Sequence, residues 1–133
     1  MREQLDGKRR AANGVSKGPS YRDLIAWQRA LDLVENAYRV TRLWTSEERY
    51  GLTNQVRRAA VSVPASIAEG QGRIGSRSFG QHLSIAYGSL CEVETHFTIA
   101  NRLGYIDLET LEQLLSETTE VARPLRGLMR SLE

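Results

Sequence analysis

The segment over residues 55–72, QVRRAAVSVPASIAEGQG, constrains the fold most, because almost none of its helical surface is suited to water. With 3.6 residues per turn, its larger apolar side chains share one face, and we expect that face to lie in a core. The residues of this core face are Leu52, Val56, Ala59, Val63 and Ile67. An ordinary surface helix has one apolar stripe and a polar remainder. This segment instead predicts a helix that is covered on several sides.

The polar face of the segment is a row with about one member per turn. Its members are Gln55, Arg58, Ser62, Ser66, Glu69 and Arg73. Beside it runs a stripe of mostly small side chains, which would let a second helix approach closely: Val61, Ala65, Ala68 and Gly72. We therefore predict that both faces form an oligomer interface with an ordered polar network. The alternative is that the row is a solvated face.

Three residues fall opposite the core face, namely Arg57, Pro64 and Gln71. Arg57 is therefore predicted to point outward. Arg58 and Glu69 lie about 16 Å apart along the helix, too far for direct contact. Glu94, on the next predicted helix, is a candidate partner for Arg58. Pro64 removes one helical hydrogen bond, which predicts a kink.

The same 3–4 periodicity predicts helices over about residues 22–43, 47–70 and 108–132, and a further helix that starts near Ser76 or Ser78 and ends at Gly104. Ser46 and Asp107 are the expected N-caps of the second and fourth helices. Four amphipathic helices with short connections predict an all-α fold, an antiparallel up-and-down four-helix bundle over residues 21–133. Residues 1–20 hold five basic and two acidic side chains, and we expect them to form a flexible basic tail.

Composition narrows the class of protein. No apolar run is long enough to span a membrane, so no membrane role is expected. A single cysteine, Cys91, excludes an internal disulfide and fits a cytoplasmic protein. The net charge is only +2. All of the 18 basic residues are arginines except Lys8 and Lys17. Arginine forks suit two-point contacts with phosphates.

The arginines on or next to the second helix are the candidate nucleic-acid contacts: Arg49, Arg57, Arg58, Arg73 and Arg77. If Arg58 is buried in a subunit interface, Arg57 becomes the better candidate. Arg77 and His82 also match the R-x4-H spacing of HEPN-type ribonucleases, a pattern that is common by chance. His82 and His96 lie about 21 Å apart along one helix, too far to share a metal. We expect no metal, no cofactor and no catalytic residues.

Three segments carry a resemblance to a known family: DLIAWQRA at 23–30, YGLTNQVRRAAVSVPASIAEG at 50–70 and LSIAYGSLCEVE at 83–94. The chain resembles, over residues 21–132, the four-helix-bundle family of 23S rRNA intervening-sequence proteins, which includes accessory proteins of diversity-generating retroelements. It departs from the family at Ser66, where Asn is usual. The resemblance implies a homopentameric ring without catalytic residues. In the retroelement branch it implies binding of nucleic acid and a reverse transcriptase.

Three functional hypotheses follow. The first is a non-enzymatic ring of bundles that binds RNA or DNA through an arginine-rich surface. The second is a purely structural or protein-binding oligomeric scaffold, which the mixed charge supports. The third and most remote is a ribonuclease that uses Arg77 and His82.

Overall fold

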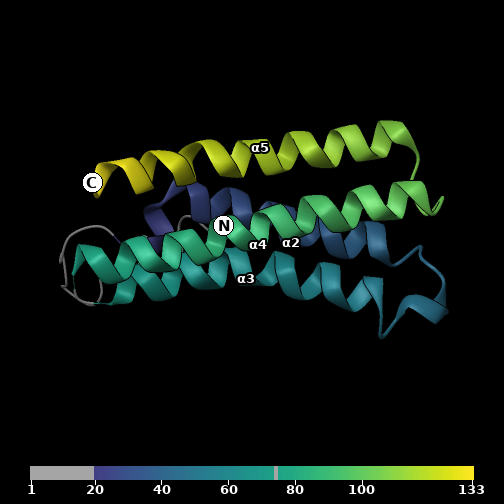
Figure 1. The fold of residues 1–133 in the computed structure, drawn as a ribbon, viewed down its shortest axis with the longest axis horizontal. Helices are drawn as coiled ribbons and strands as arrows, with labels where there is room; N and C mark the ends of the chain where they lie inside the picture. Colours follow the sequence, from purple (N-terminus) through teal and green to yellow (C-terminus); the bar gives the residue numbers. More distant parts are fainter. Residues whose placement is uncertain (1–19, 74) are drawn as a thin grey trace, which may run out of the picture.

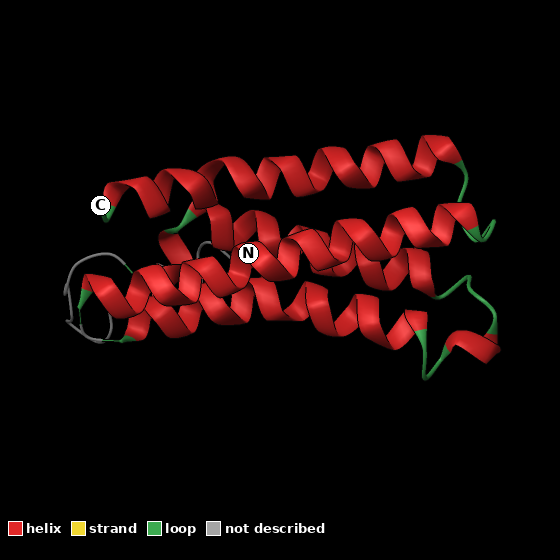
Figure 2. Ribbon diagram, in the orientation of Figure 1, coloured by secondary structure: helices red, strands yellow, loops and turns green. Residues whose placement is uncertain are grey.

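A computed structural model describes residues 20–73 and 75–133 of the chain. In these residues four α-helices lie alongside one another, and no strand is present (Figures 1 and 2). The helices are α2 (Ile25–Thr41), α3 (Leu52–Gly72), α4 (Ser76–Arg102) and α5 (Leu108–Ser131). The predicted all-α four-helix bundle is confirmed. The predicted tail over 1–20 lies, apart from Ser20, outside the described residues.

Successive helices are joined at alternate ends of the bundle (Figure 1). Each helix contacts its neighbours in sequence, and α5 closes the arrangement by packing against α2. A single core fills the space between the four helices. Each helix contributes at least one large side chain that is almost wholly inaccessible to solvent: Leu33 from α2, Ile67 from α3, Phe97 from α4 and Leu125 from α5.

The helix starts differ from the predictions at two places. Before α2, the Ser20 hydroxyl accepts a hydrogen bond from the Arg22 N–H, and the Asp23 carboxylate accepts one from the Ser20 N–H. This capping box encloses a short 3-10 turn, Tyr21–Asp23, so that α2 begins only at Ile25. The predicted helix from residue 22 is therefore wrong at its start.

The start of α3 is also later than predicted. Residues 46–48 form a separate 3-10 turn, and its cap is the Thr45 hydroxyl, which accepts a hydrogen bond from the Glu47 N–H. The predicted cap at Ser46 is therefore wrong, and α3 begins at Leu52. At α5 the prediction is confirmed, because the Asp107 side chain accepts a hydrogen bond from the Thr110 N–H.

Candidate nucleic-acid interface

The predicted core face of α3 is confirmed, because all five of its residues are buried: Leu52, Val56, Ala59, Val63 and Ile67. The prediction for the opposite face is wrong. Pro64, expected on the far side from the core, is buried too. The reason is that α3 packs against both α2 and α4, so that the buried part of its surface is wider than the core face alone.

Arg57 does not point outward. Its Nε donates a hydrogen bond to Thr41 Oγ1 at 2.8 Å, and its guanidinium carbon lies 4.5 Å from the centre of the Tyr38 ring. Both partners belong to α2. Sequence periodicity placed Arg57 opposite the core face, but α2 covers that flank of α3 and holds the side chain half-buried.

Arg58, the next residue, is exposed. Within residues 20–73 and 75–133 its side chain forms no hydrogen bond or ion pair, so the suggested pairing with Glu94 is absent from the chain. Glu94 instead accepts a hydrogen bond from the hydroxyl of the buried Thr118 on α5. A contact of Arg58 with another subunit remains a prediction.

Three of the five candidate arginines meet at one open groove of about 650 Å³, which we call the basic groove. It lies along the first half of α3, beside the end of α2. Its lining residues are Tyr38, Arg49, Tyr50, Thr53, Asn54, Arg57, Arg58, Val61 and Ser62. The lining contains arginines and no carboxylate. The lining side chains therefore carry a net positive charge, although the chain as a whole is nearly neutral.

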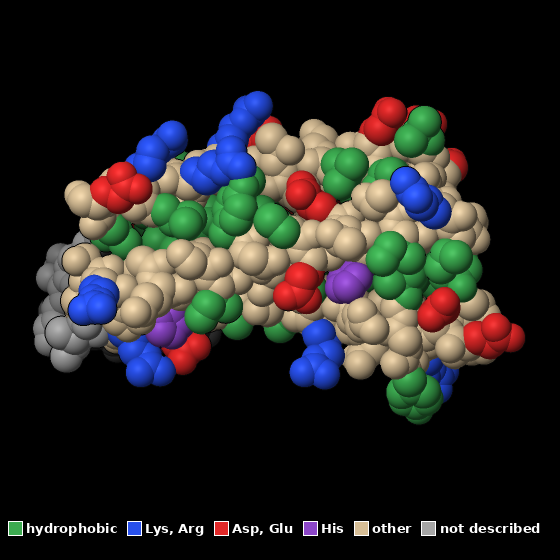
Figure 3. All heavy atoms as spheres, in the orientation of Figure 1, with side chains coloured by type: hydrophobic (Ala, Val, Ile, Leu, Met, Phe, Trp, Pro, Cys, Tyr) green, Lys and Arg blue, Asp and Glu red, His purple; other side chains and the backbone are tan. Residues whose placement is uncertain are grey.

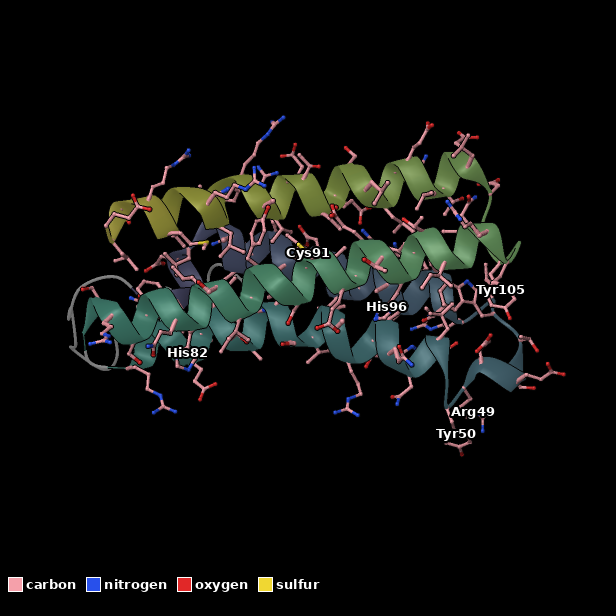
Figure 4. All side chains as sticks on the ribbon, in the orientation of Figure 1. Arg49, Tyr50, His82, Cys91, His96 and Tyr105 are labelled. Atoms are coloured by element: carbon pink, nitrogen blue, oxygen red, sulfur yellow. The ribbon has the colours of Figure 1, made fainter. Side chains whose placement is uncertain are left out.

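Arg49 and Tyr50 project together from the turn before α3, away from the helices (Figure 4). Arg49 was among the predicted contacts, whereas Tyr50 was not. The sequence did contain a signal for an exposed Tyr50. This aromatic residue lies between Arg49 and Gly51, in a turn, and does not belong to the apolar face of any helix. Nothing in helical periodicity assigns a role to such a residue.

The remaining two candidate arginines lie elsewhere. Arg73 follows the last turn of α3, about 22 Å of helix rise beyond Arg58. Its guanidinium is paired with Glu69 at 2.8 Å, and the hydrogen bond from Arg73 lowers the pKa of that exposed carboxyl, with His82 nearby acting in the same direction. Arg77 is exposed in the first turn of α4. The five arginines therefore form two groups rather than one surface.

The predicted polar row is divided between several environments. Ser66 is only 8% exposed, so it belongs to the interior of the chain and not to an outer interface. The Ser62 hydroxyl is hydrogen-bonded to the Ser89 hydroxyl of α4 at 2.9 Å. Gln55 and Ala65 are exposed, and Ala68 is half-buried. An oligomer interface at the exposed positions stays a prediction, whereas the inclusion of Ser66 is wrong.

A second, smaller hollow of about 320 Å³ lies between α3 and α4, and Arg58 borders it as well as the basic groove. His96 also lines it, and its buried Nδ1 has no hydrogen-bond partner in the described part of the chain. Burial lowers the pKa of His96, and the nearby Glu92 partly opposes this shift. This shift favours the neutral imidazole, which carries no positive charge.

The residues considered for chemistry lie apart from one another. His82 and His96 occupy separate positions along α4 (Figure 4), and Cys91 is exposed. The His82 Nδ1 lies 2.8 Å from the Ser78 carbonyl oxygen, and its Nε2 lies 3.7 Å from a Glu69 oxygen. The described part of the chain holds no group of three or more His, Cys, Asp or Glu residues placed to bind a metal ion.

Within the described ranges, no helix combines the length and apolarity required to cross a membrane.

Comparisons with known proteins agree with this architecture. The family described as "23S rRNA-intervening sequence protein" matches residues 22–127. The fold is also similar to the crystal structure of a protein of unknown function from the S23 ribosomal protein family of Bacteroides thetaiotaomicron. The TM-score is 0.69 at 21% identity, and the match covers 79% of this chain and 98% of the other. No curated protein matches the chain.

Proposed function

Because the chain belongs to the family of 23S rRNA-intervening sequence proteins, we propose that it binds RNA or DNA through the basic groove and catalyses no reaction. The observation that carries this proposal is the convergence of Arg49, Arg57 and Arg58 on one groove without a carboxylate. Phosphate contacts of this kind supply most of the affinity of sequence-independent nucleic-acid binding.

The three arginines have different roles in this proposal. Arg57 is already held by Thr41 and Tyr38, so it places a positive charge at a fixed position in the lining of the groove. Arg49 and Arg58 are exposed, and within the described residues their side chains have no partner to lose on binding. They are therefore the residues that would contact phosphates directly.

The rest of the surface limits how strong such binding can be. On the face shown in Figure 3, basic and acidic side chains are interspersed and form no continuous basic patch. The net charge of +2 gives little long-range attraction. We therefore expect binding that is confined to the groove, modest in affinity and strongly weakened by salt.

Fluorescence polarisation at ~50 mM salt, with labelled RNA and DNA, tests the proposal on the full chain. We expect the double variant Arg49→Gln/Arg58→Gln to bind at least about tenfold more weakly, with a salt slope reduced by about one per lost contact. The matched control is Arg123→Gln/Arg130→Gln on α5, which removes the same charge away from the groove and should leave binding unchanged. Equal losses in both variants, or no binding by the parent chain, would refute the proposal.

We further propose that the chain assembles into a homo-oligomeric ring, as a pentamer, which presents several basic grooves at once. Support comes from apolar side chains that remain exposed in the single chain, such as Val61 at 42% and Ile85 at 55%. Val61 belongs to the small-residue stripe of α3. A ring that forms but binds no nucleic acid would instead favour the scaffold function.

A further inference from the structure

Tyr50 is the most exposed tyrosine of the chain, with 88% of its surface accessible to solvent. All five tyrosines lie in the described residues, and the other four have ring partners. Tyr21 packs against Trp27, Tyr38 lies under Arg57, Tyr87 lies under Arg126 and Tyr105 packs against Trp44. Among the described residues, Tyr50 has neither a ring partner nor a hydrogen bond from its hydroxyl. A solvent-exposed aromatic ring beside arginines offers a surface on which a planar ligand can stack.

The turn that carries Tyr50 is held firmly on both sides. The Glu48 carboxylate accepts hydrogen bonds from the Leu52 N–H at 3.2 Å and from the Tyr105 hydroxyl at 2.7 Å. The Gly51 N–H donates to the Glu48 carbonyl oxygen at 3.0 Å. Tyr50 is therefore displayed from a fixed backbone, and a ligand that stacks on its ring would not have to order the turn first.

A second flat surface lines the same groove. The Nε hydrogen bond to Thr41 and the contact with Tyr38 hold the Arg57 guanidinium against a ring. Nucleobases stack on aromatic rings and on guanidinium planes alike, and such stacking tolerates any base because every base has a π-face. The groove thus combines flat surfaces with the exposed charges of Arg49 and Arg58.

We infer that the basic groove takes an unpaired nucleotide, whose base stacks on Tyr50 while the flanking phosphates contact Arg49 and Arg58. This inference rests on the proposed nucleic-acid function and specifies its ligand as a single strand or a loop. In a duplex the base faces are already stacked on one another, so Tyr50 could gain this contact only by opening the helix. Arginine contacts with phosphates, in contrast, are available in single strands and duplexes alike.

The test compares an unstructured single-stranded DNA oligonucleotide with the duplex that it forms with its complement. By fluorescence polarisation we expect the full chain to bind the single strand more tightly. Tyr50→Ala should weaken single-strand binding about tenfold, in the range measured for one lost stacking contact, and leave duplex binding unchanged. Tyr50→Phe keeps the ring and should stay within about twofold of the parent, since stacking needs no hydroxyl.

Leu43→Ala is the matched control. Leu43 is 87% exposed in the segment between α2 and α3 and does not line the groove. Its truncation should therefore change neither the affinity for the single strand nor the affinity for the duplex. Thermal melts by circular dichroism should show that both alanine variants keep the parent stability, because both side chains are exposed.

The possible results separate this inference from the function on which it rests. If Tyr50→Ala binds the single strand as the parent does, while Arg49→Gln/Arg58→Gln does not, stacking is overturned and nucleic-acid binding stands. Equal affinity of the parent for single strand and duplex would also overturn the unpaired-nucleotide inference. If the parent binds neither probe, the proposed function fails and the inference fails with it.

Discussion

At the scale of single residues, Arg57 and Arg58 show how neighbours on one helix come to differ. A step of one residue rotates the side chain by about 100° around the helix axis. This step moves Arg57 onto α2 and leaves Arg58 in solvent. Arg57 therefore contributes to the stability of the fold, whereas Arg58 is available for a ligand.

We expect Arg57→Gln to lower the free energy of unfolding by about 1–3 kcal/mol, because it removes the hydrogen bond to Thr41 and the contact with the Tyr38 ring. Arg58→Gln should stay within about 0.5 kcal/mol of the parent. Urea denaturation at equal chain concentration measures both. Equal destabilisation by the two variants would contradict this division of roles.

Gly70 is a second residue with a structural requirement. A Cβ at this position would lie 2.5 Å from the Cβ of His82 on α4, a distance that forces the two helices apart. Gly70→Ala should therefore cost about 1–3 kcal/mol of unfolding free energy. Gly127, within α5, has open space where a Cβ would be, so Gly127→Ala should instead gain up to about 1 kcal/mol from helix propensity. Urea denaturation of both variants makes the comparison, and a neutral Gly70→Ala would show that α3 and α4 can separate freely.

At the scale of elements, the conformation of the turn before α3 is stabilised by the carboxylate of Glu48. The hydrogen bond from the Tyr105 hydroxyl, followed by that from the Leu52 N–H, lowers the pKa of Glu48. The same bond to Glu48 raises the pKa of Tyr105. A carboxyl whose pKa is lower in the folded state stabilises the fold above its unfolded pKa. That contribution disappears as the pH falls through the folded value.

Tyr105→Phe removes this bond and keeps the ring that packs on Trp44. We expect the variant to be less stable than the parent at neutral pH. The difference should hold down to the unfolded glutamate pKa of ~4.3 and shrink as the pH falls below it. Urea denaturation across the acid range measures this difference.

Tyr87→Phe is the control, because the Tyr87 hydroxyl contacts Arg126 rather than a carboxylate. Its effect on stability should therefore not follow the glutamate titration. A difference for Tyr105→Phe that persists in acid would show that Glu48 is not the cause.

At the scale of the whole molecule, the four helices bury one core and leave apolar side chains on the outside. If the proposed ring forms, light scattering after size-exclusion chromatography should give about five times the chain mass of 15.0 kDa. Ala65→Arg places a long charged side chain in the small-residue stripe of α3 and should release smaller species. Ser116→Arg, at an exposed position of α5, should leave the mass unchanged. A monomeric parent chain would refute the ring.

Sequence reasoning found the helices, the core face of α3 and the Asp107 cap, because each follows from contacts within a few residues. It misplaced Arg57, Pro64 and Ser66, whose surroundings depend on where another helix packs. It also missed Tyr50, which lies in a turn where no periodicity constrains the side chain. The candidate site was therefore predicted only in part: its arginines were identified, but the aromatic side chain of Tyr50 was not.

Helical periodicity by itself determined the number of helices and their buried stripe, because apolar residues that recur every three or four positions can be buried together only on a helix. The tertiary structure alone decided which outer face of α3 meets α2, and hence which arginine remains exposed. It also decided that Arg49, Tyr50 and Arg58 border one groove. The physical reason is that these arrangements depend on packing between segments distant in the chain, which the spacing of residues within one helix does not encode.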